Sequence, residues 1–227
     1  MNLIKKDVLM ANRWIVEKGL VDLTWGNVSY CDRDNQLIYI KPSGVKLSSA
    51  SPGDISCIDF QENLIDGLKC SVDTPTHVEI YKAFDDTRCV IHTHSKYATI
   101  FAQANMEIPC LGTTHADYFY GNIPCVPCPN HTEIESAYEK FTGKSITSFY
   151  NEKNIVYNEV QACLVSGHGP FVWGNTIEKA LENAQVLEIV AEYAYKTLML
   201  NKESYLPQYI LNKHFLRKHG AKKYYGQ

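Results

Sequence analysis

Helical patterns at both ends of the sequence, with short apolar runs between them, constrain the fold most strongly. Apolar residues recur at helical spacing between Ile4 and Ile15, and Gly19 is expected to end that helix. Residues 178–200, dense in Ala, Leu, Glu and Val, predict a long helix, and residues 208–218 predict a shorter one. We therefore expect the strands of a sheet to lie between these ends.

Short strands and two further helices are predicted in the middle of the chain. The helices cover residues 76–84, with Pro75 in the first turn, and residues 96–104. The predicted strands cover residues 27–30, 37–40, 55–58, 89–91, 162–166 and 171–173. Strands bracketed by helices predict an α/β fold: a single three-layer domain, residues 1–227, with a largely antiparallel central sheet flanked by helices.

Composition excludes several classes of protein. The 227 residues carry a net charge of −3, so no basic surplus is available to neutralise the phosphates of a nucleic acid. No apolar run approaches the length of a membrane span, and residues 1–7 lack the features of a signal peptide. We therefore expect a cytoplasmic protein without nucleic-acid or membrane partners, whose eight cysteines are mostly free thiols in the core.

Three histidines indicate a metal centre. His92 and His94 stand two residues apart at the end of a predicted strand, where alternate side chains share a face. His168 lies between two glycines directly after another strand. Three histidines with an open fourth position are typical of catalytic zinc, although a lone histidine is more often a surface or satisfied core residue. Asp73 could supply an oxygen ligand or a partner for a ligand.

Other candidate ligands have weaker patterns. His115, in a polar loop, is the best spare metal ligand, and His131 is expected to be solvated. Cys125 and Cys128 form a lone C-x-x-C in a proline-rich loop. A structural zinc site needs a second such pair and a redox site needs a thioredoxin-like setting, so we expect neither role.

Three stretches rich in small polar residues could hold a phosphate: TWGNVS at 24–29, KPSG at 41–44 and SVDT at 71–74. Small residues let backbone N–H groups face an anion, and a helix N-terminus adds its dipole. The candidate side-chain donors are Asn27, Lys41, Ser43 and Ser71. Each stretch alone would be an ordinary turn, and none matches a nucleotide-binding glycine fingerprint.

Together these motifs resemble the class II aldolase family, which includes L-fuculose-phosphate aldolases and L-ribulose-5-phosphate 4-epimerases. The resemblance runs from Leu20 to the C-terminus. The motifs that carry it are TWGNVS (24–29), KPSGV (41–45), DTPTH (73–77), HTHS (92–95), GTTHADYFYG (112–121) and HGPF (168–171). The last residues, RKHGAKKYYGQ (217–227), resemble the epimerase branch in particular.

The resemblance implies a role for each matching residue. It implies that His92, His94 and His168 bind zinc, or another divalent ion, with Asp73 at the metal. It implies a phosphate pocket lined by Gly26, Asn27, Ser43, Gly44, Ser71 and Val72. Asp117 and Tyr225 match the acid–base pair, with the tyrosine arriving from a neighbouring subunit of a homotetramer on a tail of about residues 219–227. Relatives usually carry a second serine at Val72, so we expect weaker phosphate affinity at most.

The activity that the resemblance implies is zinc-dependent epimerisation of L-ribulose 5-phosphate to D-xylulose 5-phosphate. Deprotonation alone cannot invert C4, because the C4 proton is not acidic, whereas breaking and remaking the C3–C4 bond can. That retro-aldol route needs a Lewis acid and acid–base groups on both faces. Aldolase relatives carry a glutamate base at the position of Asp73, so the aspartate favours an epimerase. The pathway, from arabinose, ascorbate or other pentose breakdown, stays open.

Two rival functions remain. A class II aldolase would cleave a ketose phosphate to dihydroxyacetone phosphate and an aldehyde. A non-catalytic metal-binding protein would explain the histidines and cysteines, but it would not explain the phosphate loops or Asp117.

Overall fold

The computed structural model describes residues 2–220 and 223–224 and contains one eight-stranded sheet. The strands are β1 (Asn27–Asp32), β2 (Leu37–Ile40), β3 (Ser56–Asp59), β4 (Leu64–Asp66), β5 (Cys89–His92), β6 (Cys125–Val126), β7 (Ala162–Val165) and β8 (Gly169–Gly174). Their order is β4-β3-β2-β1-β5-β8-β7-β6, and every pairing is antiparallel except β6 with β7. The predicted α/β fold with a largely antiparallel sheet is confirmed.

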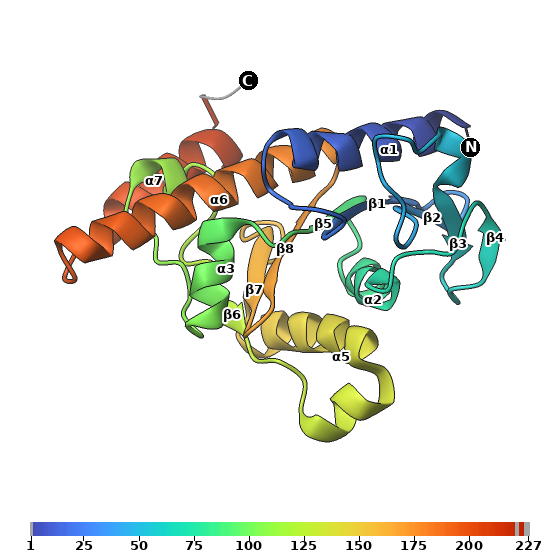
Figure 1. Ribbon diagram of the computed structural model, residues 1–227. Helices are drawn as coiled ribbons and strands as arrows, with labels where there is room; N and C mark the ends of the chain where they lie inside the picture. The colour runs from blue at the N-terminus through green and yellow to red at the C-terminus, as the bar shows by residue number, and fades with distance from the viewer. Residues whose placement is uncertain (1, 221–222, 225–227) are drawn as a thin grey trace.

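Helices cover both faces of the sheet, as Figure 1 shows. The helices are α1 (Asn2–Glu17), α2 (Thr74–Ala83), α3 (Lys96–Gln103), α4 (Thr113–Ala116), α5 (His131–Glu152), α6 (Ile177–Leu200) and α7 (Gln208–His219), with a 3₁₀ turn η1 at Pro52–Asp54. Helices α1, α3 and α6 pack on one face, and α2 and α5 pack on the other.

The apolar strand runs reflect burial on both faces. Cys89 and Ile91 of β5 join the core beneath α1, α3 and α6, whereas Val90 joins the core beneath α2 and α5. Successive side chains of a strand point to opposite faces, so a strand covered on both sides is apolar at nearly every position. The same alternation places His92 on the α2–α5 side, where its ring stacks on Phe171 at 4.3 Å between centroids.

Helix α5 is the largest element that the hydrophobic pattern did not predict. Ala137 has non-helical angles (φ −164°, ψ 71°), so the segment consists of two helical pieces joined at a kink. Gly143 and several Ser and Thr residues lower its helix propensity. A start signal was nevertheless present, because Asn130 and Glu133 form a capping box.

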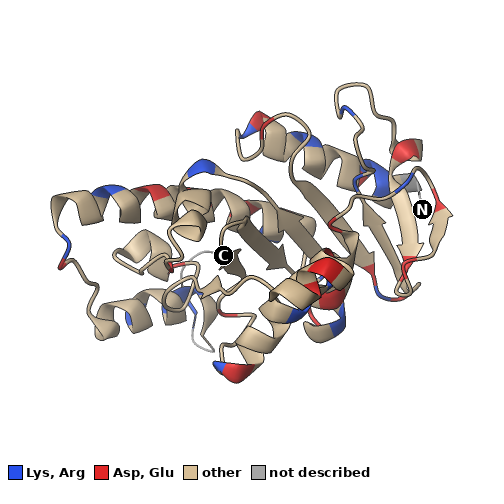
Figure 2. Ribbon diagram, turned by 60° about the horizontal axis from the view of Figure 1, so that its bottom comes forward, with Lys and Arg blue, Asp and Glu red and all other residues tan. Residues whose placement is uncertain are grey.

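The remaining global expectations concern thiols, charge and membrane spans. All eight cysteines are free, and five of them are buried. Figure 2 shows acidic and basic residues interspersed over the helices and strands. No helix among the described residues has the length and hydropathy needed to cross a bilayer.

Candidate metal centre

Three histidine rings converge at the end of β5. His92 is the last residue of that strand, His94 lies just beyond it, and His168 sits in the turn between β7 and β8. Their ring centroids are 4.7, 4.9 and 5.2 Å apart. One potential ligand nitrogen from each ring lies within 4.8 Å of the others. The fold thus brings together the three histidines that the sequence singled out.

Two glycines let the neighbouring strands approach this cluster. Gly26 has φ of +70°, and a β-carbon there would lie 2.7 Å from the His92 carbonyl oxygen. A β-carbon on Gly169 would lie 2.8 Å from the Thr93 carbonyl oxygen. Any side chain at either position would therefore push the backbone away from the histidine pair.

The hydrogen bonds of the histidines fit a divalent cation. Nδ1 of His92 donates to the Pro170 carbonyl at 3.0 Å, which leaves Nε2 unprotonated, and this Nε2 lies 3.1 Å from Nε2 of His94. Burial, with the neighbouring imidazoles, lowers the pKa of His92 well below its usual value, and burial also lowers the pKa of His94 and of His168. Neutral, converging imidazoles are the form that binds zinc.

Asp73 precedes α2 but does not cap it with its side chain. Its Oδ2 accepts instead from Asn27 Nδ2 at 2.6 Å, and the hydroxyl of Ser71 lies at 3.5 Å. The carboxylate borders the same cavity as the histidines but is not one of the converging ligand groups. Its proposed role at the metal therefore stays a prediction, and the geometry fits a neighbour of the centre better than a fourth ligand.

All the residues predicted to hold the phosphate border one cavity with the histidines. This cavity has a volume of about 390 Å³. Besides Asp73 and the three histidines, it is lined by Thr24, Trp25, Gly26, Asn27, Lys41, Ser43, Gly44, Ser71 and Val72. Thr24 and Trp25 were not among the predicted site residues, although they stand in a quoted motif. Val72 is 62% exposed.

Lys41 is the cation of this cavity. Its residue is only 4% exposed, and its Nζ donates to the Thr24 carbonyl at 2.8 Å. Its own carbonyl accepts from the Ser71 N–H at 3.1 Å, which ties the two predicted phosphate loops together. Burial lowers the pKa of Lys41, while the Asp73 carboxylate opposes that shift. A buried ammonium next to small donors is suited to an anionic group.

Asp117 does not border this cavity. It follows α4, and its carboxylate contacts two residues of α7. Nη2 of Arg217 lies 2.9 Å from Oδ2, and Nδ1 of His214 lies 3.0 Å from Oδ1. Helix α7 leads directly into the C-terminal tail. Tyr225, the predicted partner of Asp117, lies outside the described residues.

His115, which the sequence suggested as a spare metal ligand, is a structural residue. His115 is 3% exposed, and its Nε2 donates to the Gly121 carbonyl at 2.8 Å. It is not part of the histidine cluster, so the expectation that it is the best spare ligand is wrong. The solvated His131 is confirmed as exposed, and Cys125 and Cys128 are free thiols.

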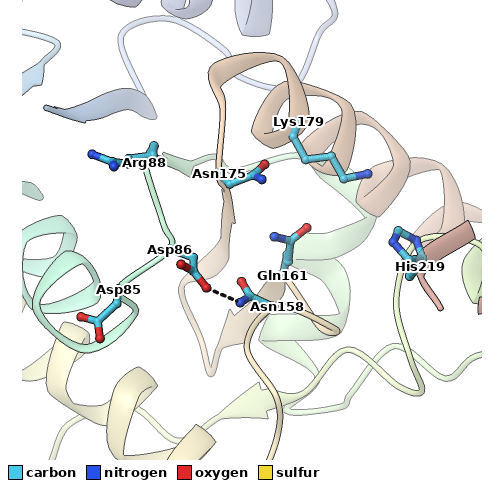
Figure 3. Close-up of a pocket in the computed structure, with 8 residues that line it drawn as sticks. All are labelled: Asp85, Asp86, Arg88, Asn158, Gln161, Asn175, Lys179 and His219. Carbon is cyan, nitrogen blue, oxygen red and sulfur yellow. Dashed lines mark hydrogen bonds between the residues drawn. The ribbon is translucent and has the colours of Figure 1, made fainter. Parts of the chain in front are cut away.

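A second hollow, of about 610 Å³, lies near the opposite end of β5 (Figure 3). In Figure 3 the side chains of Arg88 and Lys179 extend to opposite sides, and Asp86 accepts from Asn158 at 2.9 Å. Charges of both signs line it without converging on one point. The smaller cavity is therefore the better candidate site, because it holds the histidines, a buried cation and small donors.

Comparison with known proteins identifies the family. Residues 6–195 match the family described as Class II Aldolase and Adducin N-terminal domain. This chain belongs to the class II aldolase family. Class II aldolases generally depend on a divalent metal, and the described residues include a triad of histidines that could bind one. The chain is an enzyme of this superfamily.

Solved structures share the fold over nearly the whole chain. One L-fuculose 1-phosphate aldolase matches with a TM-score of 0.78 at 22% identity, covering 93% of each chain. YgbL of Escherichia coli, an aldolase/epimerase/decarboxylase-like protein, matches with a TM-score of 0.73 at 21% identity, covering 93% of this chain and 97% of that chain. L-fuculose-1-phosphate aldolase of Thermus thermophilus matches with a TM-score of 0.68 at 21% identity, covering 90% of this chain and 98% of that chain.

Proposed function

We propose that this chain is a zinc-dependent L-ribulose-5-phosphate 4-epimerase that interconverts L-ribulose 5-phosphate and D-xylulose 5-phosphate. The observation that carries the proposal is that three converging histidines, Lys41 and several small donors line one and the same cavity. A ketose phosphate has the matching ends: oxygens at C2 and C3 for a metal, and a phosphate for the loops.

His92, His94 and His168 would hold the metal, with another divalent ion as an alternative to zinc. When bound, the ion supplies Lewis-acid stabilisation of the negative charge that develops as the C3–C4 bond breaks. Lys41, Ser43 and Ser71 fix the phosphate, so the cleaved aldehyde stays in the cavity and can turn before the bond forms again.

Asp117 and Tyr225 are the proposed acid–base pair. One group takes the C4 hydroxyl proton during cleavage, and the other returns a proton to the aldehyde oxygen on the opposite face. Asp117 is tied to α7 and does not border its own subunit's cavity. We therefore propose that it enters a neighbouring subunit's cavity together with the tail, in a homotetramer.

An aldolase is the second candidate, because the solved structures with this fold include L-fuculose 1-phosphate aldolases. Such an enzyme would release dihydroxyacetone phosphate and an aldehyde from a ketose 1-phosphate. Asp73, at the position of the glutamate of aldolase relatives, favours the epimerase.

The test incubates zinc-loaded protein with L-ribulose 5-phosphate and, separately, with L-fuculose 1-phosphate. The proposal predicts D-xylulose 5-phosphate from the first substrate without free dihydroxyacetone and glycolaldehyde phosphate. Dihydroxyacetone phosphate from the second substrate alone would establish the aldolase instead.

Asp117→Asn tests the acid–base assignment. We expect kcat to fall by about 10²–10⁴-fold, because a positioned proton-transfer group typically contributes that factor. Asp34→Asn, in an exposed turn, is the matched control and should retain wild-type kcat. Unchanged kcat in Asp117→Asn would remove Asp117 from the mechanism.

A further inference from the structure

A side chain of helix α5, which stands in none of the motifs, contacts one of the three histidines of the metal centre. The hydroxyl of Tyr138 lies 3.2 Å from Nδ1 of His168. The two rings are tilted by 32° with centroids 6.1 Å apart, so the contact is through the polar edge of each ring. Tyr138 itself does not border the cavity.

We propose that Tyr138 is a positioning residue, whose hydroxyl oxygen accepts a hydrogen bond from the Nδ1–H of His168 and so turns the Nε2 lone pair toward the metal. The proposal rests on the proposed metal centre. A neutral imidazole has one protonated and one unprotonated nitrogen, and the partner of one nitrogen decides which nitrogen is left for a metal. In His92, Nδ1 donates to the Pro170 carbonyl oxygen at 3.0 Å, which leaves Nε2 for the metal in the same way.

The kink in α5 places Tyr138. Ala137 interrupts the helix, and Tyr138 begins the second helical piece. The carbonyl of Tyr138 accepts from the Thr142 hydroxyl at 2.9 Å, and the next carbonyl, of Glu139, accepts from Thr76 of α2 at 2.6 Å. The backbone at Tyr138 is therefore held from its own helix and from α2.

His168 lies in a turn outside the strand pairing, so a side-chain partner has more influence on the direction of its ring than on that of His92. It lies in a turn after Gly167, whose φ is +68°, and the side chain is half-buried rather than enclosed. His92, by contrast, is 1% exposed and is fixed by strand pairing and by stacking on Phe171. Partners of ligand histidines typically change metal affinity by about 10–100-fold.

The experiment measures zinc affinity of the metal-stripped full chain by competition with a chelator. We expect Tyr138→Phe to weaken zinc binding by about 10–100-fold while the midpoint of urea unfolding of the metal-free protein stays close to wild type. Tyr157→Phe is the matched control: it removes a hydroxyl from a ring stacked on Phe84 and should leave zinc affinity unchanged. Wild-type zinc affinity in Tyr138→Phe would overturn the proposal.

A second measurement separates this role from the activity. Nitrogen-15 NMR of metal-free protein should show His168 protonated at Nδ1 in wild type and as a mixture of tautomers in Tyr138→Phe. The same tautomer in both proteins would also overturn the proposal. If the wild-type chain binds no zinc, the assignment of the metal centre is wrong. If it binds zinc but does not convert L-ribulose 5-phosphate, only the proposed substrate is wrong.

Discussion

The histidines of this chain have different roles, which depend on the residues around them. His92, His94 and His168 share a cavity with polar residues, whereas His115 is enclosed and bonded to the Gly121 carbonyl. Burial lowers the pKa of His115 to about 4, although that hydrogen bond opposes the shift. A histidine in a conspicuous motif can therefore be structural.

His115 gives a pH prediction. The unfolded chain binds its proton near pH 6.5 and the folded chain near pH 4, so the free energy of unfolding falls as pH falls through that window, by about 3 kcal/mol in total. His115→Gln keeps a donor for Gly121 but cannot titrate. Urea unfolding of metal-free protein should show a loss between pH 7 and pH 5 that is roughly 2 kcal/mol smaller in this variant. Equal losses would contradict the prediction.

Gly169 gives a second prediction at this scale. Its added β-carbon would lie 2.8 Å from the Thr93 carbonyl and 3.8 Å from Cε1 of His92. We expect Gly169→Ala to lower the free energy of unfolding by about 1–3 kcal/mol and to weaken zinc binding, because the histidine segment must shift. Gly53→Ala, whose β-carbon would meet only the Ser51 hydroxyl at 3.6 Å, is the control and should change neither quantity.

Helices α2 and α5 pack closely against each other on the face of the sheet that carries His92. A β-carbon on Gly143 of α5 would lie 2.7 Å from the Glu79 β-carbon and 2.9 Å from the Thr76 carbonyl, both in α2. Such close contact lets Thr76 reach the Glu139 carbonyl. The position of Tyr138 therefore depends on how closely these two helices pack.

Gly143→Ala tests this packing. Overpacking is expected to lower the free energy of unfolding by about 1–3 kcal/mol, despite the better helix propensity of alanine, and to weaken zinc binding by moving α5. Ser148→Ala, on an exposed position of the same helix, should be neutral or slightly stabilising and should leave zinc affinity unchanged. A stabilised Gly143→Ala with normal zinc affinity would contradict the close packing.

At the scale of the whole molecule, the proposed mechanism needs more than one subunit. Deleting residues 223–227 is expected to abolish turnover while the zinc content per chain stays the same, since the histidines remain. Full activity of the truncated protein would exclude a catalytic tail.

Mixed oligomers test where the tail acts. His92→Asn and the truncated chain should each be inactive alone, and co-expression should restore part of the activity, because an intact tail can then enter a neighbour's intact metal site. No restoration would mean that each tail serves its own subunit or has no catalytic role.

The sequence by itself determined the elements and the candidate ligands. Short apolar runs and period-3.6 apolar patterns predicted most strands and helices. His92 and His94 at a strand end, with His168 between glycines, predicted the candidate ligands. These are local signals, because the side-chain direction in a strand and the backbone freedom of glycine depend on neighbouring residues.

The tertiary structure alone decided which residues meet. Strand pairing places β5 between β1 and β8 in the interior of the sheet, so His92 lies opposite both Asn27 and Phe171, which are distant in sequence. The tertiary structure also buries His115, places the Asp73 carboxylate against Asn27 and places the Tyr138 hydroxyl against His168. Contacts of this kind follow from the packing of helices on the sheet, which no local pattern contains.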